Sequence, residues 1–209
     1  MNEQPKSKPG RPRDPERMRR VIEVAEQLFL DQGFERTSVE AVAKASGVSK
    51  MTIYSYFPTK KALFEATIGR RIDHAFDFQS DVGLPPADPR KALTLLGRHF
   101  LALIRAEDVI RKQRVLFAEA GVQPDACSAF FSQGPLNIVA RVRDFLDSAV
   151  AVGSLQVHDT EAGADQFLSL FLGAAHIKAM LGLGKPAPEE DEGLLERNVT
   201  MFMGAYGRD

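Results

Sequence analysis

The chain lacks the motifs that mark most enzymes and metal-binding proteins. Among its 209 residues there is no tryptophan and a single cysteine, Cys127, so no intrachain disulfide can form. No Gly-x-Ser-x-Gly elbow, phosphate-binding glycine-rich loop or His-Glu-x-x-His motif is present. The four histidines are not spaced as metal ligands: His74, His99, His158 and His176. We therefore expect a protein without catalytic activity, metal ion or cofactor.

Long apolar runs and strand patterns are also missing. The longest apolar stretch, residues 167–183, contains His176 and Lys178 and is too short to span a bilayer. Residues 1–13 are basic, but no apolar core follows them, as a signal peptide would require. No stretch alternates apolar and polar residues over a useful length. These absences predict an all-α protein of the cytoplasm that does not contact a membrane.

Charge is divided unevenly along a chain whose net charge is only −1. Residues 1–70 carry 13 lysines and arginines against 9 aspartates and glutamates, and the remaining residues carry 14 against 19. The first part is therefore basic and the rest is acidic. This division favours a nucleic-acid-binding domain attached to an acidic body.

The first segments are a basic arm and a long helix. Residues 1–13 are rich in lysine, arginine and proline, and we expect this arm to be flexible. Its Arg11 and Arg13 resemble the basic residues that enter a minor groove of DNA. Asp14 is a suitable cap for a helix with Pro15 in its first position, and Gly33 is placed to end that helix.

Two short helices joined by a tight turn follow. Thr37, with Glu40 three residues later, predicts the cap of the first of them. Gly47 makes the turn, Ser49 caps the next helix, and Pro58 stops it. This is the layout of a helix-turn-helix that places its second helix in the major groove of DNA.

The second of these helices divides into an apolar and a polar side. Val48, Ile53 and Phe57 are expected to face inward. The other side carries hydroxyl, amine, thioether and phenol groups suited to base edges and phosphates: Ser49, Lys50, Met51, Thr52, Tyr54 and Tyr56. Lys60, after a Thr59 cap, and the helix start at Thr37 are placed to meet phosphates.

Residues 17–64 resemble the N-terminal domain of the tetracycline-repressor (TetR) family of bacterial transcription regulators. The resemblance rests on Gly33-Phe34, Thr37-Ser38-Val39, Gly47-Val48-Ser49, Thr52-Ile53-Tyr54 and Tyr56-Phe57. It implies DNA contacts at these positions: Thr37, Lys50, Met51, Thr52, Tyr54, Ser55, Tyr56 and Lys60. It also implies three parts, which are the flexible arm 1–13, a helix-turn-helix domain 14–66, and an α-helical effector-binding and dimerisation domain 67–209.

The larger domain is expected to hold a small-molecule pocket. The run Arg114 to Ala120, followed by Phe130-Phe131 and Gly134-Pro135, resembles AefR-like members of the family. Polar residues on apolar stripes, together with aromatic residues, are the candidate ligand contacts. They are His99, Phe100, Gln113, Phe117, Phe130, Phe131, Phe145 and His176.

The last two helices, expected over residues 159–183 and 187–206, are candidates for a homodimer interface. The first is apolar on most of its faces and must therefore be covered on more than one side. The predicted interface residues are Phe167, Leu170, Phe171, Ala174, Leu195, Val199, Phe202 and Met203. In the alternative interpretation, the same residues complete the core of a single protomer.

The sequence predicts a homodimeric repressor that binds a palindromic operator in double-stranded DNA and is released by a small-molecule effector. Half-sites for one dimer are expected roughly 34–36 Å apart. Two alternatives stay open. Cys127 could serve as a redox sensor in place of the pocket, or the protein could bind DNA without an effector and organise the chromosome.

Overall fold

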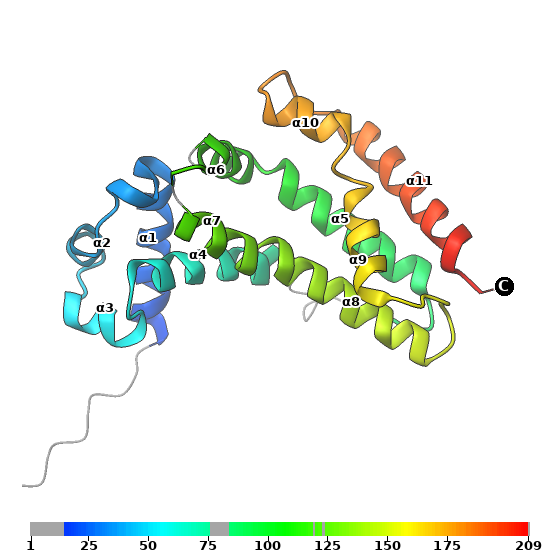
Figure 1. Cartoon of the computed structure of the whole chain (residues 1–209), viewed down its shortest axis with the longest axis horizontal. Coiled ribbons are helices and arrows are strands. Elements are labelled where there is room, and N and C mark those ends of the chain that lie inside the picture. The colour runs from blue at the N-terminus through cyan, green and yellow to red at the C-terminus, as the bar shows by residue number, and fades with distance from the viewer. Residues whose placement is uncertain (1–14, 76–83, 119, 123, 209) are drawn as a thin grey trace, which may run out of the picture.

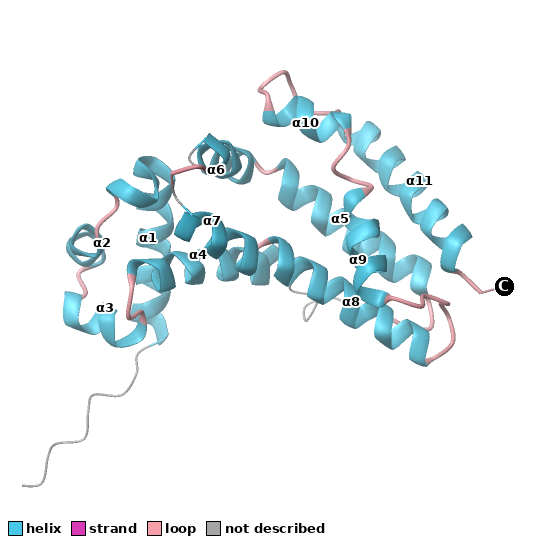
Figure 2. Ribbon diagram, in the orientation of Figure 1, coloured by secondary structure: helices cyan, strands magenta, loops and turns pink. Residues whose placement is uncertain are grey.

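The computed structural model describes residues 15–75, 84–118, 120–122 and 124–208, and within them the chain is helical (Figures 1 and 2). β-Structure in these residues is limited to one isolated bridge between Leu155 and Gly207. The all-α prediction is therefore confirmed. The predicted arm, with Arg11 and Arg13, and the Asp14 cap lie outside the described residues.

The N-terminal part, which we call the head, contains α1 (Pro15–Arg36), α2 (Val39–Ser46), α3 (Lys50–Tyr56) and the first half of α4 (Lys60–Ala75). Its core gathers residues from all four helices, including Val21, Val42, Ile53 and Leu63. Gly33 has a φ of 78°, outside the helical region, so the regular course of α1 stops there as predicted.

The cap of α2 was predicted one residue too early. Ser38, not Thr37, has the extended backbone of a cap, and its side chain accepts a hydrogen bond from the Ala41 N–H. The predicted caps Ser49 and Thr59 are confirmed, because each side chain accepts a hydrogen bond from the backbone N–H three residues later. Asp88 and Asp159 cap α5 and α9 in the same way.

The remaining helices form the body, to which the second half of α4 also belongs. They are α5 (Pro89–Arg105), α6 (Glu107–Ala118), α7 (Pro124–Gln133), α8 (Pro135–Ala151), α9 (Thr160–Ser169), α10 (Ala174–Met180) and α11 (Pro188–Tyr206). One apolar core joins α4, α5, α8, α9 and α11. Figure 1 shows α4, α7 and α6 extending from the body toward the end of α1. The predicted domain boundary at residue 66 falls inside the uninterrupted α4.

The single helix predicted over residues 159–183 is wrong. The structure has α9 and α10, separated by a turn over residues 170–173 in which Gly173 has an extended backbone. The break frees the carbonyl of Leu170, and the side-chain amide of Asn198 on α11 donates a hydrogen bond to it at 3.0 Å. Asn198 is itself buried. A partner on another helix thus stabilises a break for which periodicity gives no signal.

Most of the predicted dimer residues lie inside the protomer. Phe167, Phe171, Leu195, Val199 and Phe202 are almost fully buried in the body core, where their aromatic rings pack edge to face. For these five the alternative interpretation as protomer core is correct. Leu170 and Met203 are half-buried, and Ala174 is exposed.

Gly97 on α5 lets α5, α9 and α11 approach closely. A Cβ atom there would lie 2.6 Å from Leu195 Cδ1 and 2.9 Å from Phe171 Cζ. Because both neighbours are buried, we expect Gly97→Ala to lower the free energy of unfolding by about 1–3 kcal/mol, despite the better helix propensity of alanine. Chemical denaturation measures the change. Gly69→Ala on α4, whose Cβ would meet only the Gln133 side chain at 3.6 Å, is the control and should not destabilise. An equal effect of both substitutions would contradict the packing argument.

Candidate DNA interface and ligand cavity

Helices α2 and α3 form a helix-turn-helix. Gly47 adopts a left-handed φ of 71° between them, a conformation that glycine reaches without steric cost. Ser49 then caps α3, accepting a hydrogen bond from the Thr52 N–H at 3.2 Å. The turn fixes the angle of α3 against α2, and the head core holds its inner side.

The two sides of α3 are divided much as expected. Val48 and Ile53 are buried, and Phe57 is half-buried. Met51 is 85% exposed and Tyr54 38% exposed. The remaining predicted contacts on α3 are exposed at Ser49, Lys50 and Ser55 and half-buried at Thr52 and Tyr56. Tyr56 packs against the head core, with its ring centroid 6.4 Å from that of Phe57.

Lys50 forms an ion pair with Glu40 on α2. Their hydrogen bond lowers the pKa of the Glu40 carboxyl and raises the pKa of the Lys50 ammonium, so both stay charged at neutral pH. The ammonium also lies 5.6 Å from the centre of the Tyr54 ring. Lys50 would therefore exchange Glu40 for phosphate or a base edge if α3 entered a groove.

Thr37 and Lys60 hold the end of α1. The Thr37 side chain is buried, and its hydroxyl lies 3.0 Å from the Leu28 carbonyl and 2.8 Å from that of Gly33. Lys60 donates to the carbonyls of Phe34 and Glu35 and lies over the Phe34 ring. Thr37 therefore does not present its side chain on the surface. DNA contact by Lys60 stays a prediction, and the contact would have to share an ammonium already bonded within the head.

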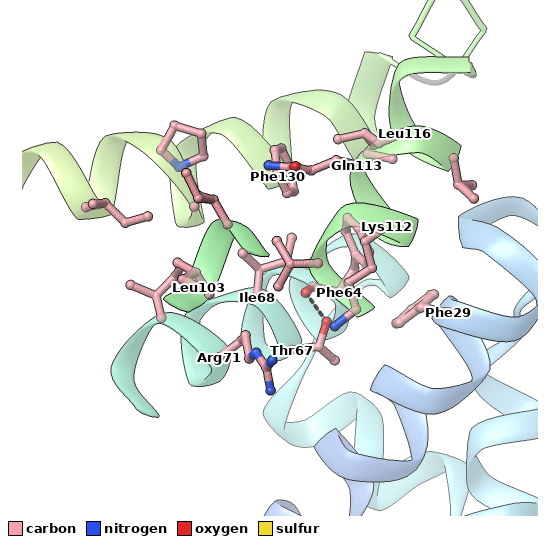
Figure 3. Close-up of a pocket in the computed structure, with 18 of the residues that line it drawn as sticks. Phe29, Phe64, Thr67, Ile68, Arg71, Leu103, Lys112, Gln113, Leu116 and Phe130 are labelled. Atoms are coloured by element: carbon pink, nitrogen blue, oxygen red, sulfur yellow. Dashed lines mark hydrogen bonds between the residues drawn. The ribbon is translucent and has the colours of Figure 1, made fainter. Parts of the chain in front are cut away.

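A cavity of about 220 Å³ lies where the head meets the body. Its lining comes from α1 and α4 on one side and from α5, α6, α7, α8 and α9 on the other. The wall is mostly apolar, with Phe29, Phe34 and Phe64 from the head and Phe100 and Phe130 from the body. Figure 3 shows residues of α4 and α6 facing one another across it. An apolar pocket with a few polar groups is the usual form of a small-molecule site.

One polar atom in the cavity wall is unpaired. Gln113 Oε1 is buried and accepts no hydrogen bond from any residue that the structure describes. Figure 3 shows the Gln113 side chain extending from α6 toward Phe130. A buried carbonyl without a donor costs free energy, and a ligand that donates an O–H or N–H would recover it.

Two ion pairs join the helices at the cavity wall. Lys112 Nζ of α6 lies 2.7 Å from Glu26 Oε1 of α1, and Arg71 of α4 lies 3.0 Å from Asp108 of α6. Lys112 also lies 3.9 Å from Asp108. Glu26, Arg71 and Lys112 all line the cavity. Among the residues described, each ionic side chain of α1, α4 and α6 that borders the cavity is therefore already engaged in an ion pair.

Of the predicted ligand contacts, three line this cavity, namely Phe100, Gln113 and Phe130. The other five predicted residues lie outside the lining of this cavity. Phe117 and Phe131 point into solvent, and Phe145 lies in the body core. His99 hydrogen-bonds the Ala75 carbonyl at 2.7 Å. His176 lies 3.5 Å from Arg105, and burial, followed by that positive charge, lowers the pKa of its imidazole. Helical periodicity alone does not distinguish a residue beside a cavity from one beside a neighbouring helix.

The sequence did not predict that α1 and α4 line the cavity. Phe64, Thr67 and Arg71 recur at helical spacing on α4, and this register could have indicated one continuous face. Glu26 carries no such signal, because its partner Lys112 is 86 residues away in the chain. Cys127 is half-buried on α7, and the redox alternative stays untested.

Comparison with known families accounts for both parts of the chain. Residues 21–67 match the family of bacterial regulatory proteins named tetR, and residues 91–208 match the AefR-like transcriptional repressor C-terminal domain. The chain belongs to the TetR family. It is accordingly a DNA-binding transcriptional regulator and not an enzyme. None of the helices described is long and apolar enough to cross a membrane.

Individual relatives agree with this membership along the whole chain. The chain is 24% identical over 192 residues to the Bacillus subtilis regulator YvkB, covering 91% of this chain and 97% of YvkB. The solved structure of the flavonoid-responsive regulator FrrA is 35% identical, with a TM-score of 0.72 over 93% of this chain and 98% of FrrA. A TetR-family regulator from Mesorhizobium loti shares the fold, with a TM-score of 0.75 and 23% identity, over 95% of this chain and 100% of that structure.

The substitution Tyr54→Ala tests DNA recognition separately from the stability of the TetR-type head. The Tyr54 side chain is 38% exposed on α3 and does not belong to the head core, so we expect Tyr54→Ala to remove little packing. We expect the affinity for an operator, selected from a pool of random duplexes, to fall at least about tenfold. Fluorescence anisotropy measures the affinity, and calorimetry should show an unchanged unfolding temperature. Tyr56→Ala is the comparison, since Tyr56 packs on the head core and its loss should lower the unfolding temperature. Unchanged operator binding by Tyr54→Ala would contradict the placement of α3.

Proposed function

We propose that this TetR-family regulator is a repressor that binds a palindromic operator as a homodimer and releases it when an aromatic, hydroxyl-bearing effector fills the cavity. The observation that carries the proposal is the position of the cavity, whose wall includes α1 and α4 of the DNA-binding head. An effector there touches the element that must move. We further propose that the protein acts in the cytoplasm, at the nucleoid.

The chemistry of the wall supports the choice of effector. Phenylalanine rings from both sides favour a flat apolar ligand, and the unpaired Gln113 Oε1 favours one with a donor group. FrrA, 35% identical over nearly the whole chain, is described as flavonoid-responsive. We therefore propose a hydroxylated aromatic compound of the flavonoid kind as the effector class.

Exposed apolar residues at the far end of the body support a homodimer. Ile177, Leu181 and Leu183, on and after α10, and Met201 on α11 are all more than half exposed. The outer side of α11 also carries Gly204, where a Cβ would meet nothing within 4 Å. We propose that this outer side, and not the buried side predicted from the sequence, pairs with its copy around a two-fold axis.

Gln113 tests the effector site. Gln113→Leu keeps the size of the side chain and removes the unpaired carbonyl, so the unliganded protein should be no less stable. We expect it to bind 7-hydroxyflavone about tenfold more weakly than wild type does, while unsubstituted flavone, which has no donor, binds both equally. Isothermal titration measures the affinities.

The companion measurement is release of the selected operator by 7-hydroxyflavone from wild type. Failure of 7-hydroxyflavone to bind wild type or to weaken its operator complex would contradict the proposed function. An equal loss of both flavones in Gln113→Leu would show instead that the substitution damages the cavity.

Met201 tests the dimer. Because its side chain is 56% exposed, Met201→Glu should leave the protomer folded but place two like charges across the two-fold axis. We expect sedimentation at micromolar concentration to change from the mass of a dimer to that of one chain. Leu136→Glu, at an exposed apolar residue near the start of α8, is the control and should stay dimeric. A wild-type mass equal to one chain would contradict the proposal.

A further inference from the structure

We propose that an anionic group on the effector binds Lys112 in place of Glu26 and thereby releases α1 of the head from α6 of the body. This proposal rests on the effector site proposed above and adds how an effector that also carries an anionic group would act on the DNA-binding head. It depends on the Glu26–Lys112 ion pair, whose two partners come from different parts of the molecule.

The Glu26–Lys112 pair connects α1 directly to α6. The carboxylate oxygen and the ammonium nitrogen are 2.7 Å apart, a distance typical of a strong charge-assisted hydrogen bond. Glu26 is followed on α1 by Phe29 and Leu30, which line the same cavity. Movement of α1 away from α6 would therefore both break the ion pair and open the apolar wall.

The Glu26–Lys112 pair is partly shielded from solvent. The side chain of Lys112 is 27% exposed and that of Glu26 is 21% exposed, against 59% and 78% for the Arg19–Glu16 pair on the surface of α1. Partly buried charges are less screened by water and salt than exposed ones. A ligand that displaces Glu26 must supply a negative charge of its own, because otherwise the partly buried Lys112 ammonium is left unpaired.

The surroundings favour Lys112 as the group that changes partner. Asp108, one turn earlier on α6, lies 3.9 Å from the Lys112 ammonium and holds the ammonium near the cavity wall. Arg71 also lines the cavity, but its partner Asp108 belongs to the body. Exchange at Arg71 would leave α1 bonded to α6. Only exchange at Lys112 removes a bond that reaches α1, among the ion pairs described at this cavity.

The experiment uses two probes that differ in charge but hardly in shape, 6-hydroxy-2-naphthoate and 6-hydroxy-2-naphthamide. Each has an apolar double ring and a hydroxyl donor suited to Gln113 Oε1. Their affinities are measured by isothermal titration for wild type, Glu26→Gln, Lys112→Met and Glu23→Gln. The last is the matched control, because Glu23 lies one turn earlier on α1 and carries the same charge, but pairs with Arg70 of α4 and Arg19 of α1 and not with α6.

In Glu26→Gln the carboxylate no longer competes for Lys112. We expect this variant to bind the naphthoate about tenfold more tightly than Glu23→Gln does, with equal affinity for the amide. Lys112→Met should bind the naphthoate about tenfold more weakly than wild type does, because the ligand then faces an unpaired Glu26. Equal naphthoate-to-amide ratios in Glu26→Gln and Glu23→Gln would overturn the proposal.

A second measurement needs no ligand. If the ion pair holds the head in its DNA-binding position, Glu26→Gln should bind the selected operator at least about threefold more weakly than Glu23→Gln, although both lose one negative charge. Thermal unfolding of both variants checks that each is folded. Equal operator affinities would overturn the proposed link to DNA binding.

Failure of the two proposals can be told apart. If the naphthoate binds neither wild type nor Glu26→Gln, competition for Lys112 is overturned. Release of the operator by 7-hydroxyflavone, which carries no carboxylate, still decides separately whether the cavity is an effector site.

Discussion

The arrangement of this molecule depends on one helix that is packed into two cores. Helix α4 places Leu63 in the core of the head and Ile72 in the core of the body, with no break between them. An uninterrupted helix transmits displacement along its length, because bending it would cost backbone hydrogen bonds. The cavity is lined by the middle of α4, between these two anchors. A change in the filling of the cavity therefore acts on the segment that positions the head.

Helix α6 is a second connection between the head and the body, and it also contacts the end of α10. Toward α1 it presents Lys112, and toward the far end of the body Arg114 donates hydrogen bonds to the carbonyls of Ala179 and Met180 at the end of α10. Glu107 of α6 also pairs with Lys185 just beyond α10. The same short helix thus contacts the DNA-binding head, the cavity and the neighbourhood of the exposed apolar residues assigned to dimerisation. In the proposed dimer, its displacement would change the spacing of the two heads as well as their contact with the bodies.

Local signals in the sequence predicted the head well, because its elements are set by short-range chemistry. Gly33, Gly47 and the Ser49 cap act within four residues of themselves, and the structure places all three as expected. The wrong or missing predictions depend on contacts between residues that are farther apart in the sequence. Thr37 and Ser38 are both good caps, and only the carbonyls of Leu28 and Gly33 decide that Thr37 turns inward. The apolar surfaces of α9 and α11 could be recognised, but not whether the covering partner was α5 of the same chain or a second copy. Likewise, Glu26 and Lys112 lie too far apart in sequence for any pattern to join them.

The position of the cavity also limits how an effector can act. A ligand shifts an equilibrium between two arrangements only by the difference in its affinity for them. In a pocket wholly inside the body, that difference would have to arise from indirect repacking. Here Phe29, Phe34 and Glu26 belong to the head, so each contact that the ligand makes with them differs directly between the two positions of the head. The Glu26–Lys112 pair also includes a directional hydrogen bond at 2.7 Å, which weakens steeply once its distance and angle depart from good geometry. Because a ligand can replace that hydrogen bond with one of its own, its exchange can convert a small shift of α1 into a discrete change of state.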